Sequence, residues 1–285
     1  MIIRHVVGIG EILWDLLPSG KQLGGGPVNF ASHVYLQGVP AAIVGSLGAD
    51  ALGLEALQSL NAIGIGSHYL ISNYEYPTGT VSVTVGENGS PSYVIHEGVA
   101  WDHLVWTAEL GDLAASARAI CFGTLSQRHA DSRVVIQRFL QSSSTDCIKV
   151  CDINLRQNYF DYEIVSQSLT LTNVLKLNDE ELPVLAGMFQ LTGSYESMVR
   201  QLISQFSLDL VALTCGGNGS MLFTANESAD HLGIPAAVVD TVGAGDAFTA
   251  ALVVGLLDGK SLDEINESAN RRAAEVCGHA GAVNH

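Results

Sequence analysis

The chain has 285 residues and a formal net charge of −16, with only 13 Lys and Arg. Nucleic-acid binding rests on clustered Lys and Arg, so we expect no nucleic-acid partner. The five cysteines form no C-x-x-C pair, and no apolar run reaches the roughly 18 residues of a membrane span, so we expect a cytoplasmic protein that contacts no membrane.

Short β-rich runs alternate with helical patterns along most of the chain. The β-rich runs are 2–10, 41–48, 118–123, 148–154, 173–178 and 209–214, and the first helical patterns are 26–38 and 51–64. Such alternation is typical of a parallel sheet with helices on both faces. It predicts an α/β three-layer sandwich with a mostly parallel central sheet, formed by residues 1–285 as a single domain.

Two segments break this alternation, residues 11–24 and 78–99, because both are expected to form strands without crossover helices. The second contains "ENGS" (87–90), whose Asn-Gly pair is a hairpin signal. We therefore expect a small β-structure beside the main sheet, and a lid is its natural function. The exposed edges of its strands also suggest a homodimer formed lid to lid.

The stretch "VVDTVGAGDAFTAALVVGLL" (238–257) places Asp246 at the start of an apolar helix. We expect Val238 and Val239 to end a strand and the three residues 243–245 to form a turn. Backbone N–H groups of 243–246 would then form a partly positive concave site for a phosphoryl group. An Asp that stabilises the helix dipole is the alternative interpretation of Asp246.

This stretch and "QLGGGPVNFA" (22–31) together resemble the paired signatures of the PfkB-type carbohydrate kinases, the ribokinase-like family, and the resemblance extends from residue 8 to about residue 282. It implies a ribokinase-like fold and an enzyme that uses ATP to phosphorylate a sugar. In that family the residue that matches Asp246 is the catalytic base. The matching turn, Gly243, Ala244 and Gly245, is the anion hole for the transferred phosphoryl group.

The resemblance also assigns residues to the sugar. Gly25 and Gly26 match a glycine hinge of the lid, and Asn29 and Asp15 match residues that hold sugar hydroxyls. Carboxylate and amide groups can accept and donate hydrogen bonds to neighbouring hydroxyls, which apolar walls cannot. A simple turn before a helix would explain the glycines but not Asn29.

Phosphate and metal sites follow from the same resemblance. Asn178 and Glu181 match an N-x-x-E motif near Mg²⁺ and its water shell, although "NDEE" alone is more often a solvated helix start. Arg156 matches an arginine whose guanidinium grips phosphate oxygens. Asp240 and the carbonyl group of Val242 match positions that hold a monovalent cation such as K⁺ in some relatives.

The nucleotide site is assigned to "LTCGGNGS", which fits the family's T-x-G-x-x-G motif through Thr214, Gly216 and Gly219. A plain hairpin turn is the alternative and is compatible with that role. Asn270 is expected to face the adenine, or else to be an ordinary surface asparagine.

Other reaction classes fit less well. Gly8 and Gly10 begin a dinucleotide-binding pattern, but Leu13 replaces its third glycine, which argues against a dehydrogenase. No G-x-x-x-x-G-K-[ST] motif is present, so a P-loop enzyme is excluded. A non-catalytic sugar-binding protein would be expected to lose Asp246 or its glycine turn, and both are intact.

Within that family, the sequence is most similar to the fructokinase branch, which implies D-fructose phosphorylated at a primary hydroxyl. The segments that carry this similarity are "GEILWDLLPSGKQLGGGPVNFA", "EGVAWD", "FGTLSQR" and "DINLRQNYF". Lys21 is the only Lys or Arg between residues 5 and 117. An acidic sugar such as 2-keto-3-deoxygluconate would therefore lack a cationic partner there. Ribose and nucleosides remain alternatives.

Overall fold

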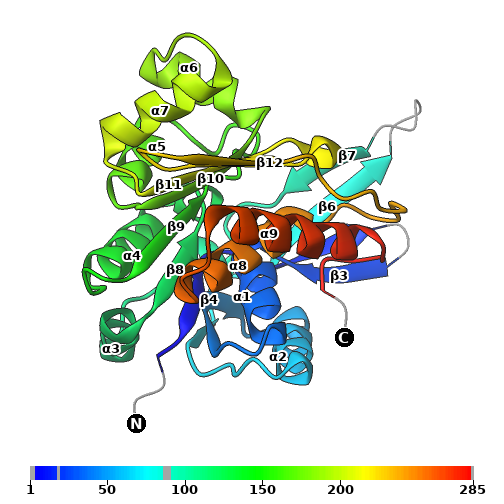
Figure 1. Ribbon diagram of the computed structural model, residues 1–285. Helices are drawn as coiled ribbons and strands as arrows, with labels where there is room; N and C mark the ends of the chain where they lie inside the picture. The colour runs from blue at the N-terminus through cyan, green and yellow to red at the C-terminus, as the bar shows by residue number, and fades with distance from the viewer. Residues whose placement is uncertain (1–3, 18–19, 86–90, 284–285) are drawn as a thin grey trace.

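The computed structural model describes residues 4–17, 20–85 and 91–283. Their main sheet has nine strands in the order β13-β12-β11-β10-β9-β8-β1-β4-β5 (Figure 1). Pairing is parallel from β5 through to β11, and only β12 and β13 join antiparallel. The strands of this sheet are β1 (Val6–Ile9), β4 (Ala41–Gly48), β5 (Leu70–Asn73), β8 (Ala119–Phe122), β9 (Ile148–Asp152), β10 (Val174–Asn178), β11 (Leu210–Thr214), β12 (Ser220–Phe223) and β13 (Ser228–His231).

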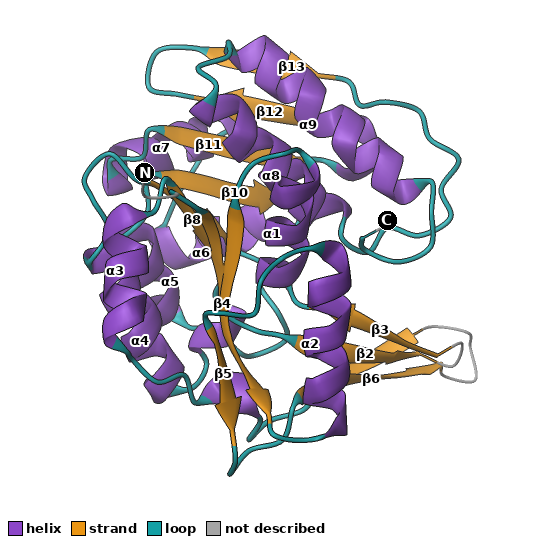
Figure 2. Cartoon of the chain, turned by 90° about the horizontal axis from the view of Figure 1, so that it is seen from below, coloured by secondary structure: helices purple, strands orange, loops and turns teal. Residues whose placement is uncertain are grey.

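Helices cover both faces of this sheet, as Figures 1 and 2 show. One face carries α1 (Gly26–Leu36), α2 (Ala51–Ile63), α8 (Ala244–Leu257) and α9 (Leu262–Cys277). The other carries α3 (Ala108–Ser116), α4 (Ala130–Gln141), α5 (Tyr162–Thr170), α6 (Glu181–Phe189) and α7 (Tyr195–Phe206). Each face has its own apolar core. Neighbouring residues of a strand point to opposite faces, so Val6 packs in the core under α1, α2, α8 and α9, and Val7 packs in the core under α3 to α7. The predicted three-layer α/β fold is confirmed.

A second sheet of four strands stands beside the first, in the order β3-β2-β6-β7. Its strands are β2 (Leu13–Leu17), β3 (Gly20–Gly24), β6 (Gly79–Val85) and β7 (Pro91–Ile95). They lie within the two segments for which the sequence predicts a lid, while the "ENGS" turn lies outside the described residues. The sheet packs on an apolar cluster that includes Leu13, Val81 and Trp101.

Three short 3₁₀ turns follow strands of the two sheets: η1 (Ala100–Asp102) comes after β7, η2 (Leu125–Gln127) after β8 and η3 (Gly216–Asn218) after β11. Parallel strands end at one edge of the sheet, so the segments after β1, β8, β9 and β10 meet there. The first turn of α1 reaches the same edge, because a Cβ on Gly26 would lie 3.8 Å from Asn154 Nδ2, which follows β9, and the first turn of α8 joins it through the contact of Asp246 with Asn29. This edge is where a ligand site is expected in an open α/β sheet.

The structure corrects one expected element. Val238 and Val239 belong to no strand, and each is 65% exposed. The sheet edge strand β13 already ends at His231, and Val239 N–H donates instead to the carbonyl group of Cys277, the last residue of α9, at 2.8 Å. Two β-branched residues are therefore insufficient for a strand where no partner strand is in reach.

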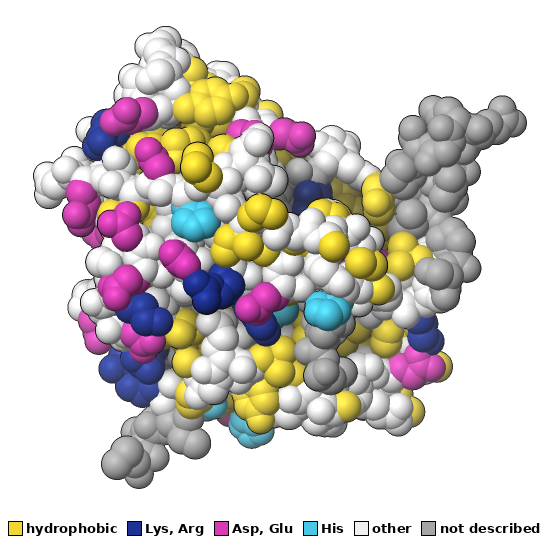
Figure 3. Space-filling view, turned by 45° about the vertical axis from the view of Figure 1, so that its right-hand side comes forward, with side chains coloured by type: hydrophobic (Ala, Val, Ile, Leu, Met, Phe, Trp, Pro, Cys, Tyr) yellow, Lys and Arg dark blue, Asp and Glu magenta, His cyan; other side chains and the backbone are white. Residues whose placement is uncertain are grey.

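The molecular surface in Figure 3 mixes acidic and basic side chains instead of separating them. Along α9, for example, Arg271 pairs with Glu267 and Arg272 with Glu275. Among the described helices, none is both long and apolar enough to cross a membrane.

Candidate active site

Asp246 lies in the first turn of α8, behind the tight turn that the sequence predicts. Gly243 precedes the helix with φ at 79°, and a Cβ placed on it would lie 2.7 Å from the Ala282 Cα. A larger residue would therefore be strained here. No described side chain caps this helix. Ala244 N–H donates to the Thr241 carbonyl group at 3.3 Å, and the helix dipole favours an anion next to the other N–H groups of the first turn.

The Asp246 carboxylate is held by one specific contact and by its surroundings. Asn29 Nδ2, from the first turn of α1, donates a hydrogen bond to Asp246 Oδ2 at 2.8 Å. Burial and then the negative charge of Asp152 raise the pKa of Asp246 to about 7, although Asn29, Lys176 and Arg156 act in the opposite direction. A carboxylate with such a pKa is suited to accept a proton near neutral pH.

Gly25 and Gly26 let the backbone of α1 approach this carboxylate. Gly25 has φ at 111°, and a Cβ there would overlap the Glu11 carbonyl oxygen. A Cβ on Gly26 would lie 3.5 Å from Asp246 Oδ1 and 3.4 Å from Glu11 Oε1. The Gly26 N–H donates to Glu11 Oε1 at 3.1 Å. The two glycines therefore place the start of α1 between two carboxylates.

Several buried polar atoms around this point lack a hydrogen-bond partner among the described residues. They include Asn29 Oδ1, together with Glu11 Oε2 and Ser126 Oγ, which lie near each other: Ser126 acts against the rise in the pKa of Glu11 that burial causes. Ser126 belongs to η2, and its Oγ lies 2.5 Å from where a Cβ of Gly10 would be. Buried polar atoms are nearly always hydrogen-bonded in native proteins, so such a group indicates a site for a polar ligand or water. Glu11 and Ser126 are absent from the residues predicted for the site, because their signal is burial, which is a tertiary property.

Asp15 projects from β2 beside Gly24, the glycine that precedes Gly25. A Cβ on Gly24 would lie 2.6 Å from Asp15 Oδ2. Burial raises the pKa of Asp15 to about 6, and the positive charge of Arg156 acts against this rise. Since Arg156 also lowers the pKa of Asp246, the guanidinium lies within electrostatic reach of both carboxylates.

A buried lysine below the turn before α8 is the main feature that the sequence analysis missed. Lys176 Nζ lies 3.0 Å from Asp152 Oδ1, and Thr249 Oγ1 donates to Asp152 Oδ2 at 2.8 Å. A Cβ on Gly245 would lie 3.0 Å from Lys176 Nζ. Burial lowers the pKa of Lys176, but the surrounding carboxylates, Asp152 first, outweigh it and raise the pKa. The charged residue inside the apolar strand "VLKLN" is the signal that could have revealed it.

The pair predicted for Mg²⁺ is engaged with the backbone. Glu181 Oε1 accepts from Leu155 N–H and Oε2 from Asn178 N–H, each at 2.9 Å. Asn178 Oδ1 accepts from Glu181 N–H at 2.8 Å. Burial raises the pKa of Glu181. These bonds hold the turn after β10 against the loop after β9, and a role toward a metal through water stays a prediction.

Arg156 lies in that loop after β9 and is exposed. Its Nη2 donates to Asn154 Oδ1 at 3.1 Å. Asn154, with φ at 40°, in turn places Nδ2 3.8 Å from where a Cβ of Gly26 would be. Arg156 is thus exposed and bonded to Asn154, whose own side chain reaches the site.

The residues predicted for the nucleotide lie at the connection from β11 to β12. Thr214 ends β11, Gly216 begins η3, and Gly219 has φ at 91° where a Cβ would overlap the His231 carbonyl oxygen. Asn270 in α9 is buried, at 7% exposed, so the alternative of a surface asparagine is wrong. Its Nδ2 donates to Ser220 Oγ at 2.7 Å, which ties α9 to β12.

Asp240 organises the segment before the glycine turn. Its Oδ1 accepts from Val242 N–H and its Oδ2 from Gly281 N–H, each at 3.0 Å. The side chain therefore joins this segment to the one after α9. The monovalent cation site at Asp240 and Val242 stays a prediction.

The three-layer α/β fold, the helix that begins behind a glycine turn and the half-buried aspartate in its first turn are typical of one enzyme class, the ribokinase-like phosphotransferases. The chain belongs to the pfkB family of carbohydrate kinases, whose family model matches residues 19–285. It is therefore a sugar kinase, which transfers a phosphoryl group to an alcohol acceptor.

Similar proteins span almost the whole chain. A fructokinase, fructokinase-2 of Oryza sativa, is 27% identical over 98% of this chain and 87% of its own length. The ribokinase of Arabidopsis thaliana is 31% identical over 91% of this chain and 68% of its own length. The crystal structure of an uncharacterized sugar kinase from Pyrococcus horikoshii in complex with ATP matches with a TM-score of 0.80 and 25% identity, covering 96% of this chain and 92% of that one.

Proposed function

We propose that the protein transfers the γ-phosphoryl group of ATP to a primary hydroxyl of a small neutral sugar, with D-fructose as the best candidate. One observation carries the proposal: the Asp246 carboxylate, oriented by Asn29, lies in the first turn of α8 next to buried polar atoms that have no hydrogen-bond partner among the described residues. A base, an anion site and a polar pocket are thus adjacent.

In this proposal Asp246 accepts the proton of the sugar hydroxyl as that oxygen attacks the γ-phosphorus. The N–H groups of residues 243–246 stabilise charge on the transferred group, and the ammonium group of Lys176 adds a positive charge beneath them. Arg156 closes on the phosphate oxygens from the loop after β9. Thr214, Gly216, Gly219 and Asn270 hold the nucleotide.

The sugar lies between the two sheets in this proposal. Asp15, Asn29 and the backbone of Gly25 and Gly26 contact its hydroxyls, and Glu11 Oε2 and Ser126 Oγ satisfy their hydrogen bonds on it. Closure of the four-stranded sheet over the sugar excludes water from the reaction. The edge strands β3 and β7 of that sheet are where a second copy would pair in a lid-to-lid homodimer.

The charges around the pocket favour a neutral substrate. Glu11, Asp15 and Asp246 are all acidic, and Arg156, the cation within reach of Asp15 and Asp246, is assigned to phosphate in this proposal, so the carboxylate of an acidic sugar would be repelled. The similarity to fructokinase-2 favours fructose, and the similarity to ribokinase keeps ribose as the second candidate.

Mg²⁺ would supply the charge neutralisation that ATP requires, held through water by Asn178 and Glu181. K⁺, or a similar monovalent ion, would be held at Asp240 and the Val242 carbonyl group. The fit is mixed: Glu181 is a buried carboxylate close to Lys176, but both its oxygens already accept backbone hydrogen bonds.

The deciding measurement is kcat/KM for ADP release with ATP, Mg²⁺ and a panel of fructose, ribose, glucose, tagatose, a nucleoside and 2-keto-3-deoxygluconate. Fructose is expected to give the highest value. A clear preference for the acidic sugar or the nucleoside would reject the neutral-sugar assignment while leaving the kinase class intact.

A further inference from the structure

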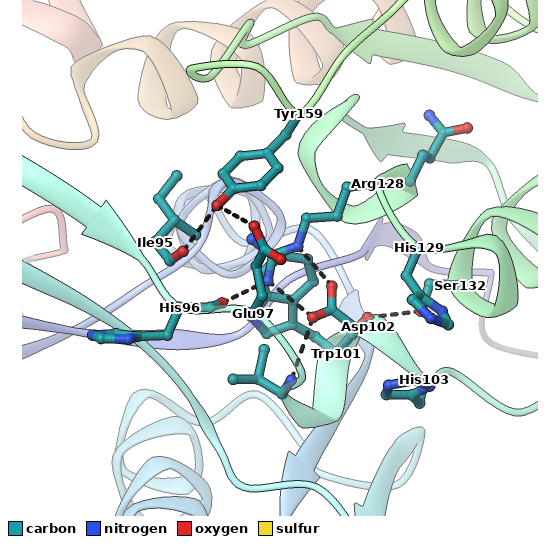
Figure 4. A network of polar contacts seen from close by, with 12 residues as sticks. Ile95, His96, Glu97, Trp101, Asp102, His103, Arg128, His129, Ser132 and Tyr159 are labelled. Carbon is teal, nitrogen blue, oxygen red and sulfur yellow. Dashed lines mark hydrogen bonds and ion pairs between the residues drawn. The ribbon is translucent and has the colours of Figure 1, made fainter.

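A group of metal-binding side chains lies outside the proposed active site, where the chain leaves η1 and enters α4. His103 follows η1 directly, His129 is the N-cap residue of α4, and Asp131 lies in its first turn. Each residue offers a ligand atom, and these atoms all lie within 4.8 Å of one another. Figure 4 shows the two imidazole rings side by side.

The separations suit a single ion. Asp131 Oδ2 lies 2.8 Å from His103 Nδ1 and 3.6 Å from His129 Nδ1. Two ligand atoms bound tetrahedrally to one Zn²⁺ at about 2.1 Å are roughly 3.4 Å apart. These two distances fall on either side of that value, and the separation between the two imidazole ligand atoms is within 4.8 Å, so side-chain rotations that replace the hydrogen bond between His103 and Asp131 would complete the geometry.

The group is partly prepared and open to solvent. Tyr76 stacks on His103 with ring centroids 3.6 Å apart and planes inclined by 15°, which limits the rotation of that imidazole. Asp131 is 57% exposed and His129 is 45% exposed, so an ion can enter. His129 Nδ1 accepts only a long hydrogen bond, 3.4 Å, from Asp131 N–H, which metal binding would replace.

We propose that His103, His129 and Asp131 form a binding site for a borderline divalent transition metal ion, with Zn²⁺ as the representative. Two imidazole nitrogens and one carboxylate oxygen are ligands that Zn²⁺ prefers, and Mg²⁺ with its demand for oxygen ligands is disfavoured. The fourth position is left for water. The site is separate from the one proposed for Mg²⁺ and ATP.

An ion at this site would connect two segments of the chain. Asp102 and Arg128 form a buried ion pair at 2.8 Å (Figure 4). His103 directly follows Asp102 in sequence, and His129 directly follows Arg128. The Arg128 guanidinium also donates to the His96 carbonyl group at 2.6 Å, just after β7. An ion between the two histidines would therefore add a second link between the segments that the Asp102–Arg128 pair already connects. This link would lie next to β7, a strand of the second sheet.

The experiment titrates metal-free enzyme with Zn²⁺, without nucleotide, by isothermal calorimetry and thermal unfolding. The full chain is expected to bind one ion at this site and to unfold at a higher temperature, because an ion that binds only the folded state stabilises it. His129→Gln and Asp131→Asn are each expected to weaken Zn²⁺ binding about tenfold or more. Loss of a residue that only hydrogen-bonds to a metal ligand already has an effect of this size, and these variants lose a ligand itself. Zn²⁺ should slow the hydrogen exchange of residues 96–103 in the unaltered chain and should leave it unchanged in the two variants.

His68→Gln is the matched control, because His68 is also an exposed histidine against a tyrosine ring, Tyr69 at 4.7 Å, but lies outside the group. It should bind as the unaltered chain does. Wild-type affinity in both His129→Gln and Asp131→Asn would overturn the proposal, as would absence of Zn²⁺ binding by the unaltered chain. The nearly isosteric Asp131→Asn keeps the test meaningful if the histidine variant folds poorly.

Discussion

Asp246 is the residue whose replacement separates chemistry from binding. Asp246→Asn removes the proton acceptor but keeps the size of the side chain and a partner for Asn29. We expect kcat to fall by roughly 10² to 10⁴-fold while the KM for the sugar changes little. Steady-state kinetics with the best sugar measures both. Asp258→Asn, at the far end of α8, is the control and should behave normally. Near-normal turnover of the Asp246 variant would reject the base assignment.

The same carboxyl links activity and stability to pH in opposite directions. Its pKa is about 7 in the folded chain, above the ordinary value of 3.8, so the folded state holds this proton more tightly. Its unfavourable contribution to folding is absent below pH 3.8 and grows as pH rises toward 7. Asp246→Asn should therefore unfold at a higher temperature than the unaltered chain at pH 7.5, with the difference vanishing near pH 4. Activity of the unaltered enzyme should decline as pH falls below about 7, since the base becomes protonated. Equal melting temperatures of the two proteins at pH 7.5 would contradict this prediction.

Lys176 and Asp152 form a buried ion pair, and one partner without the other is costly. Lys176→Met leaves the Asp152 carboxylate with Thr249 alone, so we expect a loss of about 3 to 5 kcal/mol in the free energy of unfolding. The double variant Lys176→Met/Asp152→Asn should recover most of that loss, because no unpaired charge remains. Urea denaturation measures all three proteins. A double variant no more stable than Lys176→Met would show that packing, not charge, sets the cost.

At the scale of elements, α1 depends on a glycine at its start and tolerates change at its end. Gly25→Ala would force a Cβ onto the Glu11 carbonyl oxygen at φ 111° and push the helix start away from Asp246. We expect a loss of at least about 1 to 3 kcal/mol in stability together with a fall in kcat. Gly38→Ala, beyond the other end of α1, is the matched control, because φ is 80° there but no atom of the described residues lies within 4 Å of the added Cβ. Equal kinetics of the two variants would contradict this role of Gly25.

The positions of helices and strands are easier to predict from the sequence than the contacts between residues far apart in the chain. The alternation of β-rich and helical runs predicts β4, α1 and α8 closely, because hydrophobic period and glycine turns are local signals. Val238 and Val239 were predicted as a strand end, but a strand needs a neighbour, and pairing is not a local property. Lys176 was missed for a similar reason: its partner Asp152 lies in another strand. The burial of Asn270 likewise depends on β12, which lies far from it in sequence.

For the whole molecule, net charge opposes the approach of a polyanionic substrate. The chain carries −16, and its 13 Lys and Arg are mixed with acidic residues on the face in Figure 3. Raising ionic strength with a bulky organic salt from low to physiological values should screen this repulsion and lower the KM for Mg-ATP roughly twofold. Initial rates at saturating sugar measure it. A KM that rises with salt would mean that attraction by Lys176 and Arg156 dominates over the net charge.

The contact between Asn29 and Asp246 joins positions 217 residues apart. Ribosomes add about 5 to 20 residues per second, so roughly 10 to 40 s pass between the synthesis of the two partners. During that time α1 has been made but α8, which later covers it, has not. The apolar residues Val28, Phe30 and Val34 of α1, buried in the finished protein, then lack the part of their core that α8 supplies. The nascent chain is thus expected to depend on chaperones until its last quarter is released.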